Sequence, residues 1–173
     1  LHAREMLWEE FGIEVKRETL RKICHKIGIV KRAKKRRSKV RRYRDRSRQA
    51  GLLVQMDGSY HKWFGQFESC LIAVIDDATS EVLHAEFSYA ETTFNCFKVL
   101  KEVISKKGLF RTLYVDKAGV YGGSKRVGFS HVKRGIEELG SYVLYAHSPE
   151  AKGRIERLFG TLQDRLVAEM RLK

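Results

Sequence analysis

Three carboxylates in this 173-residue sequence lie where an isolated charge would be costly. Asp57 follows the apolar run LLVQM, and Asp116 follows FRTLYV. A carboxylate in such a setting is unfavourable unless it is paired or bound to a metal. Glu156 lies at the edge of an apolar helical stripe, roughly 100° around the helix from Ile155. The separations are 59 and 40 residues.

These residue types predict a specific chemistry. Carboxylates at the ends of neighbouring strands can converge on one point, and a third can reach it from a helix that crosses the sheet end. Mg²⁺ and Mn²⁺ prefer such hard oxygen ligands, and two ions together can hold the attacking and leaving oxygens of a phosphodiester. Asp57, Asp116 and Glu156 therefore predict a metal-dependent phosphoryl-transfer site.

Ordinary roles compete with this interpretation. A single aspartate at a strand end is usually a turn residue, and a glutamate in an amphipathic helix is usually solvated. The presence of all three carboxylates together, in the order of the expected elements, favours the catalytic role. Glu150 is the rival third ligand, but it falls in the loop before the helix.

The elements that must position these residues follow from hydrophobic periodicity. Strands are expected at 52–60, 68–79, 81–90, 109–117 and 141–146, and helices at 92–108, at 129–139 and from Pro149 onward. In the first of these helices the expected core face is Phe94, Phe97, Leu100, Val103 and Ile104. This order predicts an α/β domain with a mixed five-stranded sheet flanked by helices.

Three motifs carry a resemblance to a known family: MDGS at 56–59, VDKAGVYG at 115–122 and SPEAKGRIERLFGTLQDRL at 148–166. Over residues 51–173 the sequence resembles the DDE-class integrase core of insertion-sequence transposases and retroviral integrases, which has a ribonuclease-H-like fold. The chain departs from the family pattern in reading Lys117-Ala118-Gly119 after the second aspartate, where Asn or His with Gly is common. The spacing from Asp116 to Glu156 is also slightly wider than usual.

The resemblance implies that Asp57, Asp116 and Glu156 are the catalytic residues and hold two Mg²⁺ or Mn²⁺ ions. It implies direct phosphoryl transfer without a covalent protein intermediate: cleavage of a transposon end, then attack of the freed hydroxyl on target DNA. Asp76 and Asp77 fall in the family's hairpin and are expected to be turn residues, not ligands.

A strongly basic tract, residues 31–48, precedes this domain. It holds 12 basic residues and one acidic residue, which is +11 of the chain's net charge of +14. Such a tract suits a polyanion because each neutralised phosphate releases a condensed counterion. It predicts a nucleic-acid partner, with a solvated linker or a targeting tract as the alternative.

Residues 1–30 predict two short amphipathic helices that resemble a partial helix-turn-helix DNA-binding segment, with a plain packing hairpin as the alternative. Residues 31–50 are then a basic linker and 51–173 the catalytic core. The sequence begins inside a helical pattern and without methionine, which indicates a piece of a longer protein.

Basic residues near the acidic site, in the tract and in the second helix are the candidate phosphate contacts. They are Lys152, Arg154, Arg157, Lys117, Lys125, Arg36, Arg37, Arg41, Arg42, Arg17 and Arg21. A solvated surface charge is the alternative for each one.

The composition excludes several classes of protein, namely those built on disulfides, on zinc knuckles or on membrane spans. Three widely spaced cysteines form neither a disulfide framework nor a zinc knuckle, and no apolar run reaches the length of a membrane span. The expected setting is cytoplasmic, at the bacterial nucleoid, and the expected partners are DNA at transposon ends and target, with a homo-oligomer on DNA. Two other functions stay open: a ribonuclease-H-like nuclease that hydrolyses without joining, and a DNA-binding module with an inactive triad.

Overall fold

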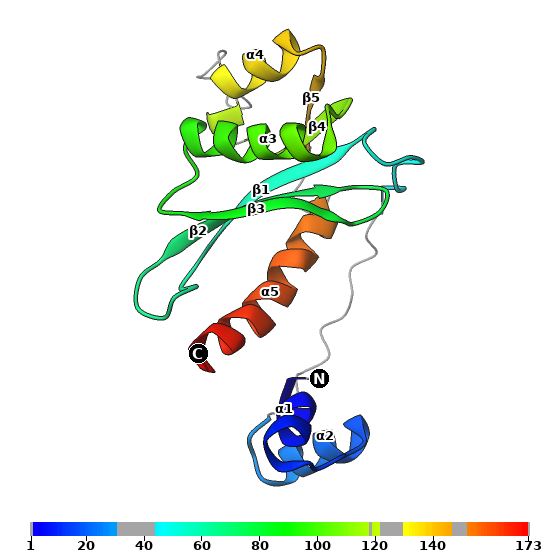
Figure 1. Cartoon of the computed structure of the whole chain (residues 1–173), viewed down its shortest axis with the longest axis vertical. Helices are drawn as coiled ribbons and strands as arrows, with labels where there is room; N and C mark the ends of the chain where they lie inside the picture. Colours follow the sequence, from blue (N-terminus) through cyan, green and yellow to red (C-terminus); the bar gives the residue numbers. More distant parts are fainter. Residues whose placement is uncertain (1, 31–43, 118, 122–129, 147–151, 173) are drawn as a thin grey trace. The chain divides into compact units, whose positions relative to one another are not determined.

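The computed structural model describes residues 2–30, 44–117, 119–121, 130–146 and 152–172 (Figure 1). The chain forms two compact units, one spanning 1–40 and the other 41–173. Across the described residues, no helix combines the length and apolar character needed to cross a membrane.

The smaller unit contains two helices, α1 (His2–Phe11) and α2 (Arg17–Lys26). Gly12 follows α1 with φ +64°, a conformation that glycine adopts without strain and that turns the chain toward α2. The two expected helices are therefore present. Their large apolar side chains stay largely exposed within this unit, as at Trp8, Phe11, Ile23 and Ile27.

The larger unit is built on a sheet whose five strands are β1 (Val54–His61), β2 (Ser69–Asp76), β3 (Val82–Ser88), β4 (Thr112–Val115) and β5 (Tyr142–Tyr145). Their order is β3-β2-β1-β4-β5. The first three strands pair antiparallel, while β4 pairs parallel to both β1 and β5. The predicted mixed five-stranded sheet is confirmed.

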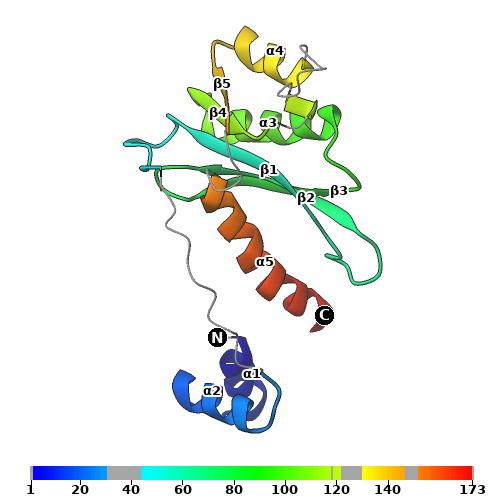
Figure 2. The ribbon, with the colours of Figure 1, turned by 180° about the vertical axis from the view of Figure 1, so that it is seen from behind.

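Helices cover both faces of this sheet (Figures 1 and 2). Helices α3 (Thr93–Lys107) and α4 (His131–Glu138) lie on one face, with the short 3₁₀ helix η1 (Gly119–Tyr121) beside α4. Helix α5 (Gly153–Leu172) lies on the other face. Each face has its own apolar core.

Strand β2 shows why both faces need a cover. All eight of its residues are buried, and successive side chains of a strand point to opposite faces. Cys70, Ile72 and Val74 join the core under α3, whereas residues 71, 73 and 75 join the core under α5. A strand that is apolar on both faces requires helices on both sides.

The predicted core face of α3 is right at Leu100, Val103 and Ile104, which are buried or pack against the core, and wrong at its two phenylalanines. Phe94 is 76% exposed and Phe97 is 37% exposed, so neither belongs to the buried face. The buried residues are Cys96, Val99, Leu100 and Val103, at the spacing of one helical stripe. The smaller side chains of Cys96 and Val99 therefore face the sheet. Phe97 instead packs against Gly135 of α4, where an added Cβ would lie 2.8 Å from the Phe97 ring.

The hairpin between β2 and β3 is held by Asp76. Its Oδ1 accepts hydrogen bonds from the backbone N–H groups of Ala78 and Thr79, both at 2.9 Å. Its Oδ2 accepts one from the Gly51 N–H at 2.8 Å. The expected turn role of Asp76 is confirmed, and the turn is tied to the chain that enters β1.

Residues 44–50 also contact this turn. The Arg46 guanidinium donates to the Ala78 carbonyl at 3.0 Å. The Ser47 N–H donates to the Asp77 carboxylate at 2.7 Å. The last residues of the basic tract are therefore part of the larger unit, ahead of the start at residue 51 that composition suggested.

Candidate active site

Asp57 and Asp116 are brought to one end of the sheet by strand direction. Asp57 lies within β1, and Asp116 directly follows β4. The two strands run parallel, with Val54 opposite Leu113 and residue 55 opposite 114. Neighbouring parallel strands present their carboxyl ends at the same edge, so the two carboxylates approach one another as the sequence predicted.

The two aspartates share one ammonium group. The Nζ of Lys152 lies 2.8 Å from Oδ1 of Asp57 and 3.7 Å from Oδ2 of Asp116. The Lys152 side chain is only 4% exposed, while those of Asp57 and Asp116 are 18% and 45% exposed. A nearly buried positive charge thus bridges the acidic pair.

The electrostatics of Asp57 follow from this arrangement. Burial raises the pKa of Asp57, because the charged form is poorly solvated there, and the Lys152 ammonium opposes the rise. The nearby Asp116 carboxylate adds to the rise. A cation beside the pair is therefore what favours two ionised carboxylates at this position.

Glu156 lies in the first turn of α5 and is exposed. It comes four residues after Lys152, which is about one helical turn or 5.4 Å along the axis. Among the described residues, no three His, Cys, Asp or Glu side chains lie close enough together to hold a metal ion. The structure therefore joins Asp57 and Asp116 through Lys152, and it places Glu156 one turn beyond that lysine, outside the bridged pair.

Helix α5 is held along β1 by apolar and polar contacts. Ile155 is fully buried and Phe159 is 6% exposed, both in the core against β2. About one turn beyond Phe159, the Gln163 amide donates to the Ser59 hydroxyl at 3.0 Å. Because Asp57 and Ser59 are two residues apart on β1, both side chains face α5.

The donor set suits a hard divalent cation. Two carboxylates that already share a nearly buried positive charge form an environment that favours cations, and carboxylate oxygens are the ligands preferred by Mg²⁺. The residues present therefore fit the metal that the sequence motifs imply.

Comparison with known proteins gives a consistent relationship. No protein-family model matches the chain. The chain is 37% identical over 178 residues to a Sinorhizobium fredii (strain NBRC 101917 / NGR234) protein named as a transposase, y4bF, and this alignment covers 99% of the chain and 39% of that protein. It is 31% identical over 209 residues to the transposase for insertion sequence IS1202 of Streptococcus pneumoniae, covering 98% of the chain and 45% of that protein. The chain belongs to the insertion-sequence transposases. It spans less than half the length of these two relatives.

Solved structures establish the fold of this transposase chain. An intasome of simian T-cell lymphotropic virus, in complex with the PP2A regulatory subunit B56 gamma, matches with a TM-score of 0.62 at 19% identity, over 75% of this chain and 44% of that one. The HTLV-2 integrase catalytic core domain in complex with magnesium, in its trimeric form, matches with a TM-score of 0.58 at 16% identity, over 72% of this chain and 75% of that one. The larger unit therefore has the integrase catalytic core fold.

A fourth acidic residue, Glu91, lies near the aspartate pair and was missed from sequence. It lies in the loop between β3 and α3, and its carboxylate accepts a hydrogen bond from the Tyr121 hydroxyl. Burial raises the pKa of Glu91, and the charges of Asp57 and Asp116 are near enough to raise it further.

The signal for Glu91 in the sequence is indirect. Gly58, next to Asp57, leaves the space that Glu91 uses: a Cβ at Gly58 would lie 2.9 Å from Cδ of Glu91. A glycine directly after the first aspartate indicates a close approach by another group, but only the fold shows which group it is.

Four of the candidate phosphate contacts flank the acidic site. Lys117 is exposed directly after Asp116. Arg157 is exposed on α5, and its Nε donates to the Gly153 carbonyl at 3.2 Å. Lys152 and Arg154 instead face carboxylates, Lys152 at the two aspartates and Arg154 at Asp77.

The remaining candidates lie farther away or outside the described residues. On α2, Arg17 is exposed, and Arg21 is exposed while pairing with Glu18 at 2.6 Å. Arg36, Arg37, Arg41, Arg42 and Lys125 lie outside the described residues. Two aromatic side chains, Trp63 and Tyr121, are 0% and 1% exposed and are packing residues that cannot stack on a base, while Phe64 is 61% exposed.

Proposed function

We propose that this chain is the catalytic core of a transposase that cleaves DNA at transposon ends and joins the cut strand to target DNA. The observation that carries the proposal is the convergence of Asp57 and Asp116 on a single, nearly buried ammonium at the end of two parallel strands. The aspartate pair lies in an integrase-like core, and the chain is related to insertion-sequence transposases. Both findings support a role of this pair in phosphoryl transfer.

Asp57, Asp116 and Glu156 would hold Mg²⁺ or Mn²⁺, with two ions in the active complex. When bound, such ions polarise a phosphodiester and stabilise the charge that develops on its attacking and leaving oxygens. The similar HTLV-2 integrase core, named as a complex with magnesium, supports this cofactor. Glu156, in the first turn of α5 and four residues after Lys152, is the proposed third ligand, and its carboxylate would have to join the aspartate pair when the metal binds.

The remaining residues bind and orient DNA. Lys117 and Arg157, exposed on either side of the acidic site, would contact phosphates and set the position of the scissile bond. No side chain of this chain is assigned as a nucleophile, because phosphoryl transfer needs only positioning and charge stabilisation around a water or a hydroxyl. A homo-oligomer assembled on DNA is the proposed working form, in line with the viral intasome to which the fold is similar.

The test replaces each proposed ligand by its uncharged isostere. Asp57→Asn, Asp116→Asn and Glu156→Gln are each expected to lower Mn²⁺-dependent cleavage and joining of DNA by at least about 100-fold. Replacing a residue that only hydrogen-bonds to a metal ligand already lowers metal affinity or activity by about 10–100-fold. Plasmid nicking and oligonucleotide joining measure the two steps separately, with basal DNA binding unchanged.

Asp164→Asn is the matched control, since it removes the same charge from an exposed position on α5. The control is expected to cleave and join like the parent chain. Near-parental joining by any of the three isosteres would refute that residue's assignment. If the parent chain cleaves DNA but does not join it, the hydrolytic nuclease is favoured instead. If the parent chain does neither, with Mn²⁺ present, an inactive DNA-binding module is favoured.

A further inference from the structure

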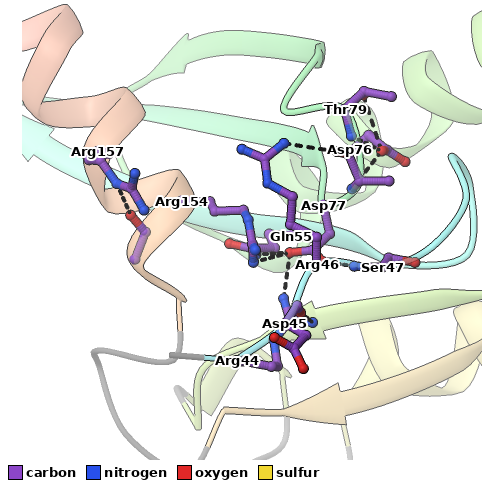
Figure 3. A network of polar contacts seen from close by, with 12 residues as sticks. Arg44, Asp45, Arg46, Ser47, Gln55, Asp76, Asp77, Thr79, Arg154 and Arg157 are labelled. Carbon is purple, nitrogen blue, oxygen red and sulfur yellow. Dashed lines mark hydrogen bonds and ion pairs between the residues drawn. The ribbon is translucent and has the colours of Figure 1, made fainter. Parts of the chain in front are cut away.

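Asp77, the residue that follows β2, is fully buried and surrounded by donors (Figure 3). Its Oδ1 accepts from the Arg154 guanidinium at 2.8 Å, from the Gln55 amide at 2.6 Å and from the Arg44 guanidinium. Its Oδ2 accepts from the Ser47 N–H at 2.7 Å. Four groups from three separate parts of the chain thus meet on one carboxylate.

The charge balance of this cluster keeps Asp77 ionised. Burial alone would raise the pKa of Asp77, but the hydrogen bonds from Arg44 and Ser47 outweigh it, so that its pKa lies below the usual range. A buried charge is tolerated when it is paired and hydrogen-bonded, and removal of a partner leaves an uncompensated group.

The partners of Asp77 are placed in a regular way relative to the proposed ligands. Gln55 comes two residues before Asp57 on β1, and Arg154 comes two residues before Glu156 on α5. Both donate to the same oxygen, Oδ1 of Asp77. One atom therefore fixes the strand of the first proposed ligand against the helix of the third.

Arg44 extends the arrangement to the second ligand. Its guanidinium carbon lies 5.2 Å from the centre of the Tyr114 ring, a cation–π contact. Tyr114 comes two residues before Asp116. The elements that carry all three proposed ligands thus meet at the Asp77–Arg44 pair.

We propose that Asp77, together with Arg44 and Arg154, is a positioning group that sets the place of Glu156 relative to Asp57 and Asp116. This inference rests on the proposed function, and it makes residues 44–47 a working part of the catalytic unit. Asp77 itself does not touch metal or DNA. It acts through the strand end and the first turn of α5.

A double-mutant cycle on metal binding tests this role. Arg154→Gln is expected to lower the affinity for Mn²⁺ about tenfold, the lower end of the effect of groups behind a metal ligand. In a Glu156→Gln background the same change is expected to have little further effect, because the ligand that Arg154 positions is already lost. Mn²⁺ binding by electron paramagnetic resonance, on the whole chain and without DNA, gives both numbers.

Two further variants keep the test decisive. Arg44→Gln, at a side chain that is 32% exposed and therefore tolerant, is expected to weaken Mn²⁺ binding in the same direction if Arg154→Gln does not fold. Arg134→Gln removes an equal charge from an exposed pair on α4 and is expected to leave Mn²⁺ affinity unchanged.

The outcomes separate the inference from the proposed function. If Glu156→Gln leaves Mn²⁺ affinity unchanged, the assignment of Glu156 as a metal ligand in the proposed function is wrong, whatever the role of Asp77. If Glu156→Gln weakens binding but Arg154→Gln and Arg44→Gln do not, only the positioning role is wrong. Equal losses from Arg154→Gln in the parent and in the Glu156→Gln background would also overturn it, since they would show a general effect on the fold.

Discussion

At the scale of single residues, Lys152 has the most unusual environment in the site. Its ammonium contacts the Asp57 and Asp116 carboxylates as a bound metal ion would, and its side chain is nearly buried. A divalent ion that binds the same two carboxylates must compete with this ammonium or displace it. Lys152 was expected from sequence to contact DNA phosphates, and such contact requires it to leave the aspartates.

Replacing Lys152 therefore has opposite effects on stability and on metal binding. Lys152→Met is expected to lower the unfolding free energy without added metal, by less than the about 3–5 kcal/mol typical of a fully buried broken pair, because Asp116 is half-exposed. The same variant is expected to bind Mn²⁺ about tenfold more tightly, since a competing charge is gone. Denaturant unfolding and Mn²⁺ titration measure the two effects.

Lys98→Met is the matched control for Lys152→Met. Lys98 pairs with Glu86 on the surface, where an ion pair contributes little, so both quantities are expected to stay close to those of the parent chain. Weaker Mn²⁺ binding by Lys152→Met would show that the lysine assists the metal and does not compete with it.

At the scale of elements, the closest approach near the site is between β1 and the loop before α3. Gly58 of β1 leaves room for Glu91 and Cys70, and an added Cβ would lie 2.9 Å from Cδ of the glutamate and 3.0 Å from Sγ of the cysteine. Both contacts are shorter than van der Waals distances, so this strand position accepts no side chain without displacement of its neighbours.

Gly58→Ala is accordingly expected to destabilise the chain by about 1–3 kcal/mol through overpacking. Gly160→Ala, on α5, is the control with the opposite sign, because no atom lies within 4 Å of an added Cβ there and alanine favours helix by up to about 1 kcal/mol. Thermal unfolding of the two variants measures the contrast. An unchanged midpoint for Gly58→Ala would contradict the contact with Glu91.

The elements themselves were largely predictable from sequence, because they depend on local periodicity. Alternating and continuous apolar runs located the five strands, and the order of elements gave the mixed sheet. The two strand-end aspartates followed from the same patterns. The outward position of Phe94 and Phe97 on α3 did not, because these side chains are as apolar as Cys96 and Val99.

The partners of the site residues depend on contacts between distant segments. The pairing of Lys152 with Asp57 and of Arg154 with Asp77 spans 95 and 77 residues, and no local pattern encodes either. Sequence alone treats Lys152, Arg154 and Arg157 alike as candidates for contact with DNA. Packing divides them, since Arg157 is exposed while Lys152 and Arg154 face carboxylates.

At the scale of the whole molecule, charge is the dominant feature. The chain carries +14, and most of this lies in residues 31–48, a tract that includes the boundary between the two units at residues 40 and 41. Arg44, near the end of this tract, pairs with Asp77, whereas the candidate DNA contacts within the tract, Arg36, Arg37, Arg41 and Arg42, all precede it. A tract of this charge tethered to the catalytic unit would hold DNA near the site without reading its sequence.

Neutralising the tract tests this role. Changing Arg36, Arg37, Arg41 and Arg42 together to Gln is expected to lower affinity for all DNA sequences alike. It is also expected to reduce the slope of log affinity against log salt by up to about 3–4, since each lost phosphate contact is worth about 0.9. Fluorescence anisotropy over a range of salt concentrations measures the slope. A slope equal to that of the parent chain would exclude these residues as phosphate contacts.

We expect Asp57, Asp116 and Glu156 to hold a divalent cation together. A crystal of the chain soaked in Mn²⁺, with anomalous diffraction recorded, tests this set of ligands. The expected result is an anomalous peak within about 2.5 Å of a carboxylate oxygen of each residue, near the upper limit for a hard cation. A peak bound elsewhere, or one on the two aspartates with the Glu156 carboxylate turned away from it, would show that the three residues do not form one site.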